Sequence, residues 1–220
     1  MILCGVPQGA ILSPILFLLY IADLLQIIAW HNLRPHMYAD DIQIYGFCSP
    51  STSSSLQEQI STCIDDVVIW LRSNRLQINT AKTEVLWCTS SLRQHQIPQT
   101  PIRVGSDAIL PAASVRNLGI HLDSDVSMKT HITKTVSSCF AVLRQIRSVR
   151  RSVTKPVLLS LVISLVLSRL DYGNATLAGL PQQSLSRLQS ALNAAARLVY
   201  AARKYEHVTQ LLRDLHGRAH

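Results

Sequence analysis

Hydrophobic positions divide the chain into a mixed first part and a helical second part. Residues 13–30 are almost continuously apolar and begin with Ser13 and Pro14, which suit the N-cap and the first position of a helix. The pattern predicts a helix that ends near Trp30, and we expect it to be buried because most of its faces are apolar. Helical spacing of apolar residues predicts a second helix over residues 56–75, after a serine-rich loop at 49–55.

Short β-prone segments surround an acidic pair, Asp40-Asp41. Residues 37–39 and 42–45 predict a hairpin that carries this pair at its turn. Further along the chain, the pattern predicts a strand at 84–88, a hairpin at 102–110 and another strand at 115–122 that Gly119 interrupts. The first part is therefore expected to mix helices with antiparallel strands.

After residue 127 the apolar spacing becomes helical throughout. It predicts helices near 129–150, 154–171, 182–203 and 205–215, and the leucine stripe of the third is expected to face a core. The predicted fold class is α+β up to residue 127 and all-α afterwards. We therefore expect two domains, residues 1–127 and 128–220.

Charge follows the same division. Residues 1–128 hold seven Lys/Arg and ten Asp/Glu, a net charge of −3, whereas residues 129–220 hold fourteen and three, a net charge of +11. This asymmetry indicates a polyanion-binding half, although an inert basic surface would have the same composition. Within the basic half, a row recurs at steps of three and four residues and is expected to share one helix face: Arg144, Arg147, Arg151 and Lys155.

Two further features of the sequence bear on the cellular compartment and on membrane association. The apolar run at 10–30 has the length of a membrane span, about 20 residues, but Pro14 and Asp23 interrupt it. An aspartate near the centre of a span costs about 2.5–3.5 kcal/mol, so we expect a buried helix and no membrane partner. The five cysteines are odd in number and form no Cys-x-x-Cys pair, which is typical of a reducing compartment, the cytoplasm or nucleus.

The acidic pair is the candidate chemical centre. Two adjacent carboxylates at a tight turn suit a hard cation such as Mg²⁺. Two such ions about 3.5–4 Å apart stabilise the attacking and leaving oxygens in phosphoryl transfer. For the dipeptide alone, a solvated Asp-Asp turn is the simpler interpretation.

The context of the pair changes that interpretation. Gly-Val-Pro-Gln-Gly at 5–9, Ser-Pro-Ile-Leu-Phe at 13–17 and Tyr-Ala-Asp-Asp at 38–41 resemble two successive palm motifs of reverse transcriptases, in the same order. Residues 70–84, 117–123 and 170–173 are similar to later segments of LINE-type (non-LTR) retrotransposon enzymes. The resemblance is specific from residue 5 to 123 and looser beyond. It implies a partial right-hand polymerase palm, built of antiparallel strands with helices, followed by an all-α thumb-like region.

The resemblance also implies roles for the residues that match. Asp40 and Asp41 would bind catalytic Mg²⁺, Tyr38 would lie against the primer terminus, and Lys82 would lie near the leaving pyrophosphate. The pocket for the template base and the incoming dNTP would be shaped by Pro7, Gln8 and Gly9.

The remaining implied roles concern nucleic acid. Leu118 and Gly119 would belong to the primer grip, and the row from Arg144 to Lys155 would contact phosphates of the duplex formed by the RNA template and the DNA primer. This binding would be independent of sequence and sensitive to salt.

One part of the family pattern is missing from the chain. In the family a further aspartate, on a palm strand before the Gly-x-Pro-Gln-Gly motif, completes the metal site, and no counterpart stands in this sequence. We therefore expect a truncated retrotransposon copy or a partial gene that does not extend primers alone. The alternatives are a non-catalytic nucleic-acid-binding remnant and a helical membrane or interaction protein.

Overall fold

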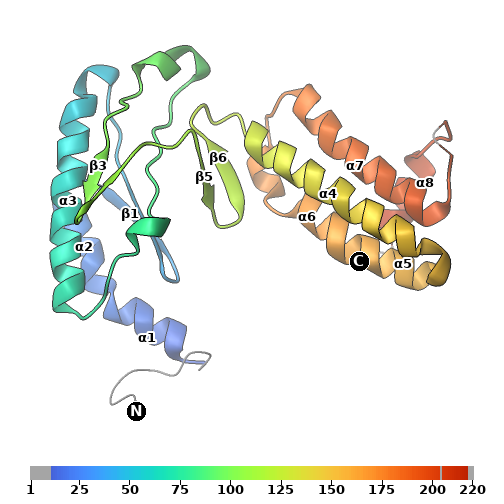
Figure 1. Cartoon of the computed structure of the whole chain (residues 1–220), viewed down its shortest axis with the longest axis horizontal. Coiled ribbons are helices and arrows are strands. Elements are labelled where there is room, and N and C mark those ends of the chain that lie inside the picture. The colour runs from blue at the N-terminus through green and yellow to red at the C-terminus, as the bar shows by residue number, and fades with distance from the viewer. Residues whose placement is uncertain (1–10, 204, 218–220) are drawn as a thin grey trace. The chain divides into compact units, whose positions relative to one another are not determined.

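A computed structural model describes residues 11–203 and 205–217. The chain divides into two compact units, unit 1 (Met1–Ala113) and unit 2 (Ser114–His220), shown in Figure 1. Pro7, Gln8 and Gly9, which are predicted to shape the nucleotide pocket, lie outside the described residues. Mixed helices and small antiparallel sheets confirm the α+β class in its coarse form.

Unit 1 packs short helices and hairpins around one long helix. Its elements are α1 (Ser13–Tyr20), α2 (Ala22–Trp30), β1 (Arg34–Tyr38), β2 (Asp41–Tyr45), α3 (Ser53–Ser73), β3 (Ile102–Val104) and β4 (Asp107–Ile109). Apolar residues at helical steps along α3, such as Leu56, Cys63 and Val67, pack against Leu24 and Ile28 of α2. Ile42 and Ile44 of β2 pack against the same cluster, which fixes the β1–β2 hairpin to the helices.

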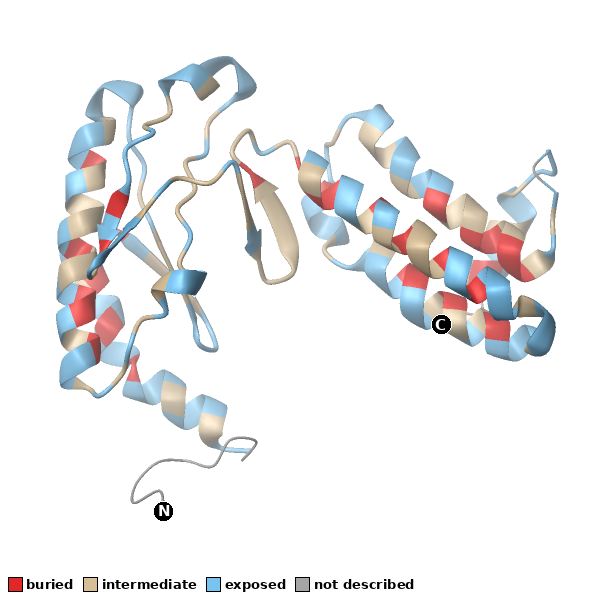
Figure 2. Ribbon diagram, viewed as in Figure 1, coloured by how far each residue is buried: buried red, intermediate tan, exposed pale blue. Residues whose placement is uncertain are grey.

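The prediction of one buried helix over residues 13–30 is wrong. The helix breaks at Ile21, and only the α2 part has buried residues, Leu24 and Ile28. In α1 no residue is buried, and Leu19 is 68% exposed; Figure 2 shows this helix without buried positions. The reason is that the apolar cluster of α3 covers α2 alone. By length and composition, Ser13–Trp30 is the one helical stretch among the described residues that could cross a membrane.

Three other local predictions need correction. The α3 helix begins at Ser53, inside the predicted serine loop, because Ser49 and Thr52 form a capping box around the short helical turn Pro50–Thr52. No strand forms at 84–88, where Val85 makes a single bridge to Pro111. Residues 115–122 are two strands, β5 (Ser114–Asn117) and β6 (Ile120–Asp123).

Unit 2 continues from this hairpin into a helical bundle. Its helices are α4 (Lys129–Val149), α5 (Lys155–Val162), a π turn (Ile163–Leu167), α6 (Ser168–Asp171), α7 (Gln182–Tyr200) and α8 (Thr209–His216), with short 3₁₀ turns at Arg150–Ser152 and Asn174–Leu177. Buried residues lie along the inner faces of α4, α5 and α7 (Figure 2). Three fully buried alanines of α7, Ala191, Ala195 and Ala196, contribute to this core. The four predicted helices are confirmed, the last with a later start.

The unit boundary also differs from the predicted one at residue 127. Ile120 and Leu122 of β6 pack against a cluster that includes Met128 and Ile132 at the start of α4. The β5–β6 hairpin therefore belongs to the helical unit. Its dependence on α4 explains why the structure divides after Ala113 and not after residue 127.

Candidate functional site

The acidic pair lies at the tip of the β1–β2 hairpin, as predicted. The strands pair in antiparallel register, with Tyr38 opposite Asp41, so Ala39 and Asp40 form a two-residue turn. Ala39 has a φ of +53°, in the left-handed region that costs a non-glycine residue about 1–2 kcal/mol. The backbone is therefore strained directly beside the pair.

Both carboxylates are available to an external cation. Asp40 and Asp41 are exposed, and within residues 11–203 and 205–217 neither carboxylate group forms a hydrogen bond or an ion pair. Two carboxylates together with substrate phosphates are a set of ligands that suits one Mg²⁺ ion. A two-ion arrangement needs further ligands, and no group of three or more His, Cys, Asp or Glu side chains that could hold a metal occurs among the described residues.

Two other predicted residues of unit 1 take different positions relative to the pair. Tyr38 is 61% exposed and lies opposite Asp41 in the register, so the two side chains share one face of the hairpin next to its tip. Lys82 is exposed at the end of a 3₁₀ turn, Thr80–Lys82. Among described residues it forms no ion pair with either aspartate, so its predicted role near a pyrophosphate stays a prediction.

The predicted basic row of unit 2 does not lie on one helix face. Arg144 and Arg147 are exposed on α4, which ends at Val149. Arg151 lies in the following 3₁₀ turn, and Lys155 begins α5. The spacing is compatible with one helix, but α4 ends between Arg147 and Arg151, and the chain changes direction before α5. The Lys155 Nζ atom lies 4.7 Å from the centre of the Tyr200 ring, a cation–π contact that holds its side chain.

The surroundings of this row are uniformly basic in sequence. Residues 126–170 contain eight Lys/Arg and no Asp/Glu. Without local carboxylates, the exposed guanidinium groups of Arg144, Arg147 and Arg151 have no acidic neighbour along this segment. Such a surface can bind phosphates through charge.

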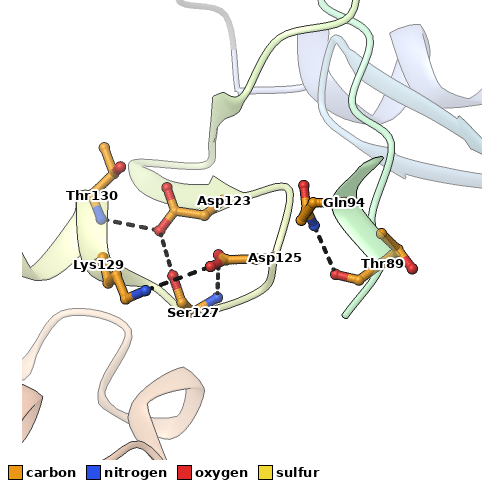
Figure 3. A network of polar contacts seen from close by, with 7 residues as sticks. All are labelled: Thr89, Gln94, Asp123, Asp125, Ser127, Lys129 and Thr130. Carbon is orange, nitrogen blue, oxygen red and sulfur yellow. Dashed lines mark hydrogen bonds and ion pairs between the residues drawn. The ribbon is translucent and has the colours of Figure 1, made fainter. Parts of the chain in front are cut away.

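A polar network joins the β5–β6 hairpin to α4 (Figure 3). The buried Asp123 carboxylate accepts hydrogen bonds from the Thr130 backbone N–H at 3.0 Å and the Ser127 hydroxyl at 3.4 Å. Asp125 accepts from the Ser127 N–H at 3.0 Å and lies 3.7 Å from Lys129 Nζ. Asp123 thus binds one of the unpaired N–H groups in the first turn of α4. The sequence showed Asp123 after a strand motif but gave no local sign of this capping role.

The same junction contains a buried histidine. His131 is 5% exposed, and its Nδ1 atom accepts a hydrogen bond from the His121 N–H at 3.5 Å. Burial lowers the pKa of His131, as does His121, against an opposing effect of Asp123. For Asp123, burial raises the pKa, but the hydrogen bonds that the carboxylate accepts, chiefly from Thr130, together outweigh it and the net pKa is lowered.

These two shifts predict acid sensitivity of unit 2. Because both pKa values are lower in the folded state, the unfolded chain binds more protons as pH falls. The stabilisation is present above the ordinary pKa of each group. It should begin to be lost below about pH 6.5, through His131, and further below about pH 4, through Asp123. Urea unfolding followed by helical circular dichroism at pH 7.0 and 5.5 measures the first step.

The variant His131→Gln should abolish most of the loss between these two pH values, since glutamine does not titrate. The exposed His207 provides a matched control, and His207→Gln should retain the loss. An equal loss in wild type and His131→Gln would contradict the assignment.

Comparison with known proteins adds independent information. Residues 1–122, more than half of the chain, match the family described as "Reverse transcriptase (RNA-dependent DNA polymerase)". A curated relative from Drosophila melanogaster, "Probable RNA-directed DNA polymerase from transposon BS", is 26% identical over 221 residues. The match covers 96% of this chain but only 24% of the relative, so the chain spans about a quarter of its length. No solved structure matches the chain.

Proposed function

Because the chain belongs to the reverse transcriptase (RNA-dependent DNA polymerase) family, we propose that it is part of the RNA-directed DNA polymerase of a LINE-type retrotransposon. The observation that carries the proposal is the Tyr38–Asp41 hairpin tip, where two exposed carboxylates lie at a two-residue turn fixed to a hydrophobic cluster. In this proposal unit 1 is a partial palm, and the helices of unit 2 are thumb-like.

Asp40 and Asp41 are the proposed ligands of Mg²⁺. The ion, when bound, neutralises charge that develops on the phosphoryl group as a dNTP is joined to the primer 3′-hydroxyl. The protein contributes a pair of carboxylates that no internal cation neutralises among the described residues. Tyr38, exposed beside the pair, would contact the primer terminus, and Lys82 would offset charge on the pyrophosphate. Pro7, Gln8 and Gly9 are proposed to contact the template base and dNTP.

Unit 2 is the proposed binding surface for the RNA–DNA duplex. Arg144, Arg147 and Arg151 supply exposed positive charge in a segment without acidic residues, and Lys155 extends it across the corner into α5. Leu118 and Gly119, at the turn of the β5–β6 hairpin, are proposed to meet the primer strand. Contacts to phosphates set orientation and affinity but do not read sequence.

The second candidate function is nucleic-acid binding without catalysis. The observation in its favour is that the basic segment belongs to unit 2, whereas the acidic hairpin belongs to unit 1. In this case duplex binding would survive the loss of both aspartates, and the chain would act as a binding module alone.

Salt dependence tests the proposed binding surface. Affinity of the full chain for an RNA–DNA hybrid should fall steeply between 50 mM and 200 mM salt, because each neutralised phosphate releases counterions. Replacing both Arg144 and Arg147 with Gln should reduce the slope of log affinity against log salt by about 2. Fluorescence anisotropy measures both quantities.

Unit 1 provides a matched control for this pair. Arg72 and Arg75 are exposed and also three residues apart, and their double replacement with Gln should leave the slope unchanged. A flat salt response of the wild-type chain, or equal effects of the two double variants, would overturn the assignment.

Metal binding tests the proposed ligands. Mn²⁺, used in place of Mg²⁺, should broaden the NMR signals of the Tyr38 ring, because Tyr38 lies directly opposite Asp41 in the hairpin. The double variant Asp40→Asn/Asp41→Asn should abolish the broadening, since amides are poor substitutes for carboxylates on a hard cation.

A second adjacent aspartate pair, on α3, serves as the control. Asp65 is already paired with Arg103, and Asp66 with His31 at 2.8 Å. Their double replacement with Asn should leave the Tyr38 broadening intact. Persistent broadening in the Asp40/Asp41 variant would contradict a metal site at the hairpin tip.

A further inference from the structure

The β5–β6 turn contacts a segment that lies far away in sequence. Leu118 and Gly119 form the turn, and Tyr172 and Gly173 directly follow α6. The Tyr172 hydroxyl donates a hydrogen bond to the Leu118 carbonyl oxygen, across 54 residues of chain. The sequence motif containing Tyr172 gave no indication of this partner.

Two glycines make the contact close. A Cβ atom on Gly119 would lie 3.0 Å from Cε1 of the Tyr172 ring. A Cβ atom on Gly173 would lie 2.7 Å from Cδ1 of Ile120, nearer than such atoms approach. Each segment therefore places a glycine where the other presents a side chain. Both glycines also have positive φ, +84° and +72°.

The hydrogen bond fixes the orientation of one peptide group. Leu118 and Gly119 both have positive φ, as the two-residue type I′ hairpin turn requires. The peptide between the two central residues takes no part in the hydrogen bond that closes such a turn. Tyr172 holds its carbonyl, and because the peptide is trans and planar, the Gly119 N–H points the opposite way.

The contact adds little to the anchoring of the hairpin itself. That anchoring comes from Ile120 and Leu122 against the α4 cluster and from the Asp123 carboxylate on the first turn of α4. Tyr172 is 53% exposed and so buries only part of its ring. The hydrogen bond from this half-exposed tyrosine therefore fixes the direction of the turn and contributes little to the stability of the hairpin.

We propose that Tyr172, Gly119 and Gly173 form a latch that positions the β5–β6 turn for contact with the backbone of an RNA–DNA hybrid. Tyr172 is a positioning residue in this arrangement and touches no nucleotide itself. The proposal rests on the proposed function of unit 2 as a duplex-binding surface. It adds the device by which the fold orients the turn beside the exposed Arg116 of β5.

Removal of one hydroxyl tests the latch. In the full chain, Tyr172→Phe should weaken hybrid binding about three- to tenfold, the effect of losing one hydrogen bond. The slope of log affinity against log salt should stay unchanged, because no phosphate-binding charge is removed. The control Tyr205→Phe, at a 75% exposed tyrosine of the same unit, should bind as wild type does. Binding is measured well below the thermal unfolding midpoint, so that all variants are folded.

A pair of glycine variants provides a second, independent test. Gly173 and Gly179 both have positive φ, but no atom lies within 4 Å of a Cβ built on Gly179. Gly173→Ala should therefore weaken binding, whereas Gly179→Ala, with similar backbone strain, should not. Wild-type affinity of both Tyr172→Phe and Gly173→Ala would overturn the latch while the proposed function stands. Absence of hybrid binding by the unaltered chain would overturn the proposed function and the latch with it.

Discussion

A two-stranded hairpin is only marginally stable in water, so each hairpin in this chain depends on the helix behind it. Ile42 and Ile44 fix the acidic hairpin to the cluster of α2 and α3. Ile102 and Val104 of β3 are buried in unit 1, and Ile120 and Leu122 fix the β5–β6 hairpin to the start of α4. In the β1–β2 and β5–β6 hairpins the apolar strand residues pack on the scaffold. At the tip of the β1–β2 hairpin this leaves the acidic pair exposed.

The two turns with candidate functions lie in units of different charge. The Ala39–Asp40 turn, followed by Asp41, presents negative charge that suits a hard cation, whereas the β5–β6 turn belongs to the unit with the basic segment. Nucleotide polymerisation uses both kinds of surface, because metal ions act on phosphate groups while cationic side chains bind the phosphates of the nucleic acid. The division of charge between the units is consistent with the proposed function.

Local sequence patterns predicted much of the fold, and the predictions that were wrong have physical causes. Apolar spacing predicted α3, α4 and the hairpin around Asp40 because each has one face on a core. Spacing alone could not show that α1 lacks a covering partner or that the chain turns after Val149, since both depend on what packs nearby. The sequence around Gly119 predicted an interrupted strand and not a turn. A leucine rarely takes a positive φ, so Leu118 did not indicate the turn that it forms. The hydrogen bond from Tyr172 to Leu118 joins residues 54 positions apart, and no periodic pattern in the sequence indicates it.

The most direct measurement is primer extension by the isolated chain, on an RNA template with a DNA primer, dNTPs and Mg²⁺. With Asp40 and Asp41 as the proposed Mg²⁺ ligands, the described residues contain too few further ligands for a two-ion site. We therefore expect no DNA synthesis by this chain alone, even where the hybrid is bound. Mg²⁺-dependent synthesis that Asp40→Ala abolishes would contradict this expectation and would show that these 220 residues contain a complete catalytic centre.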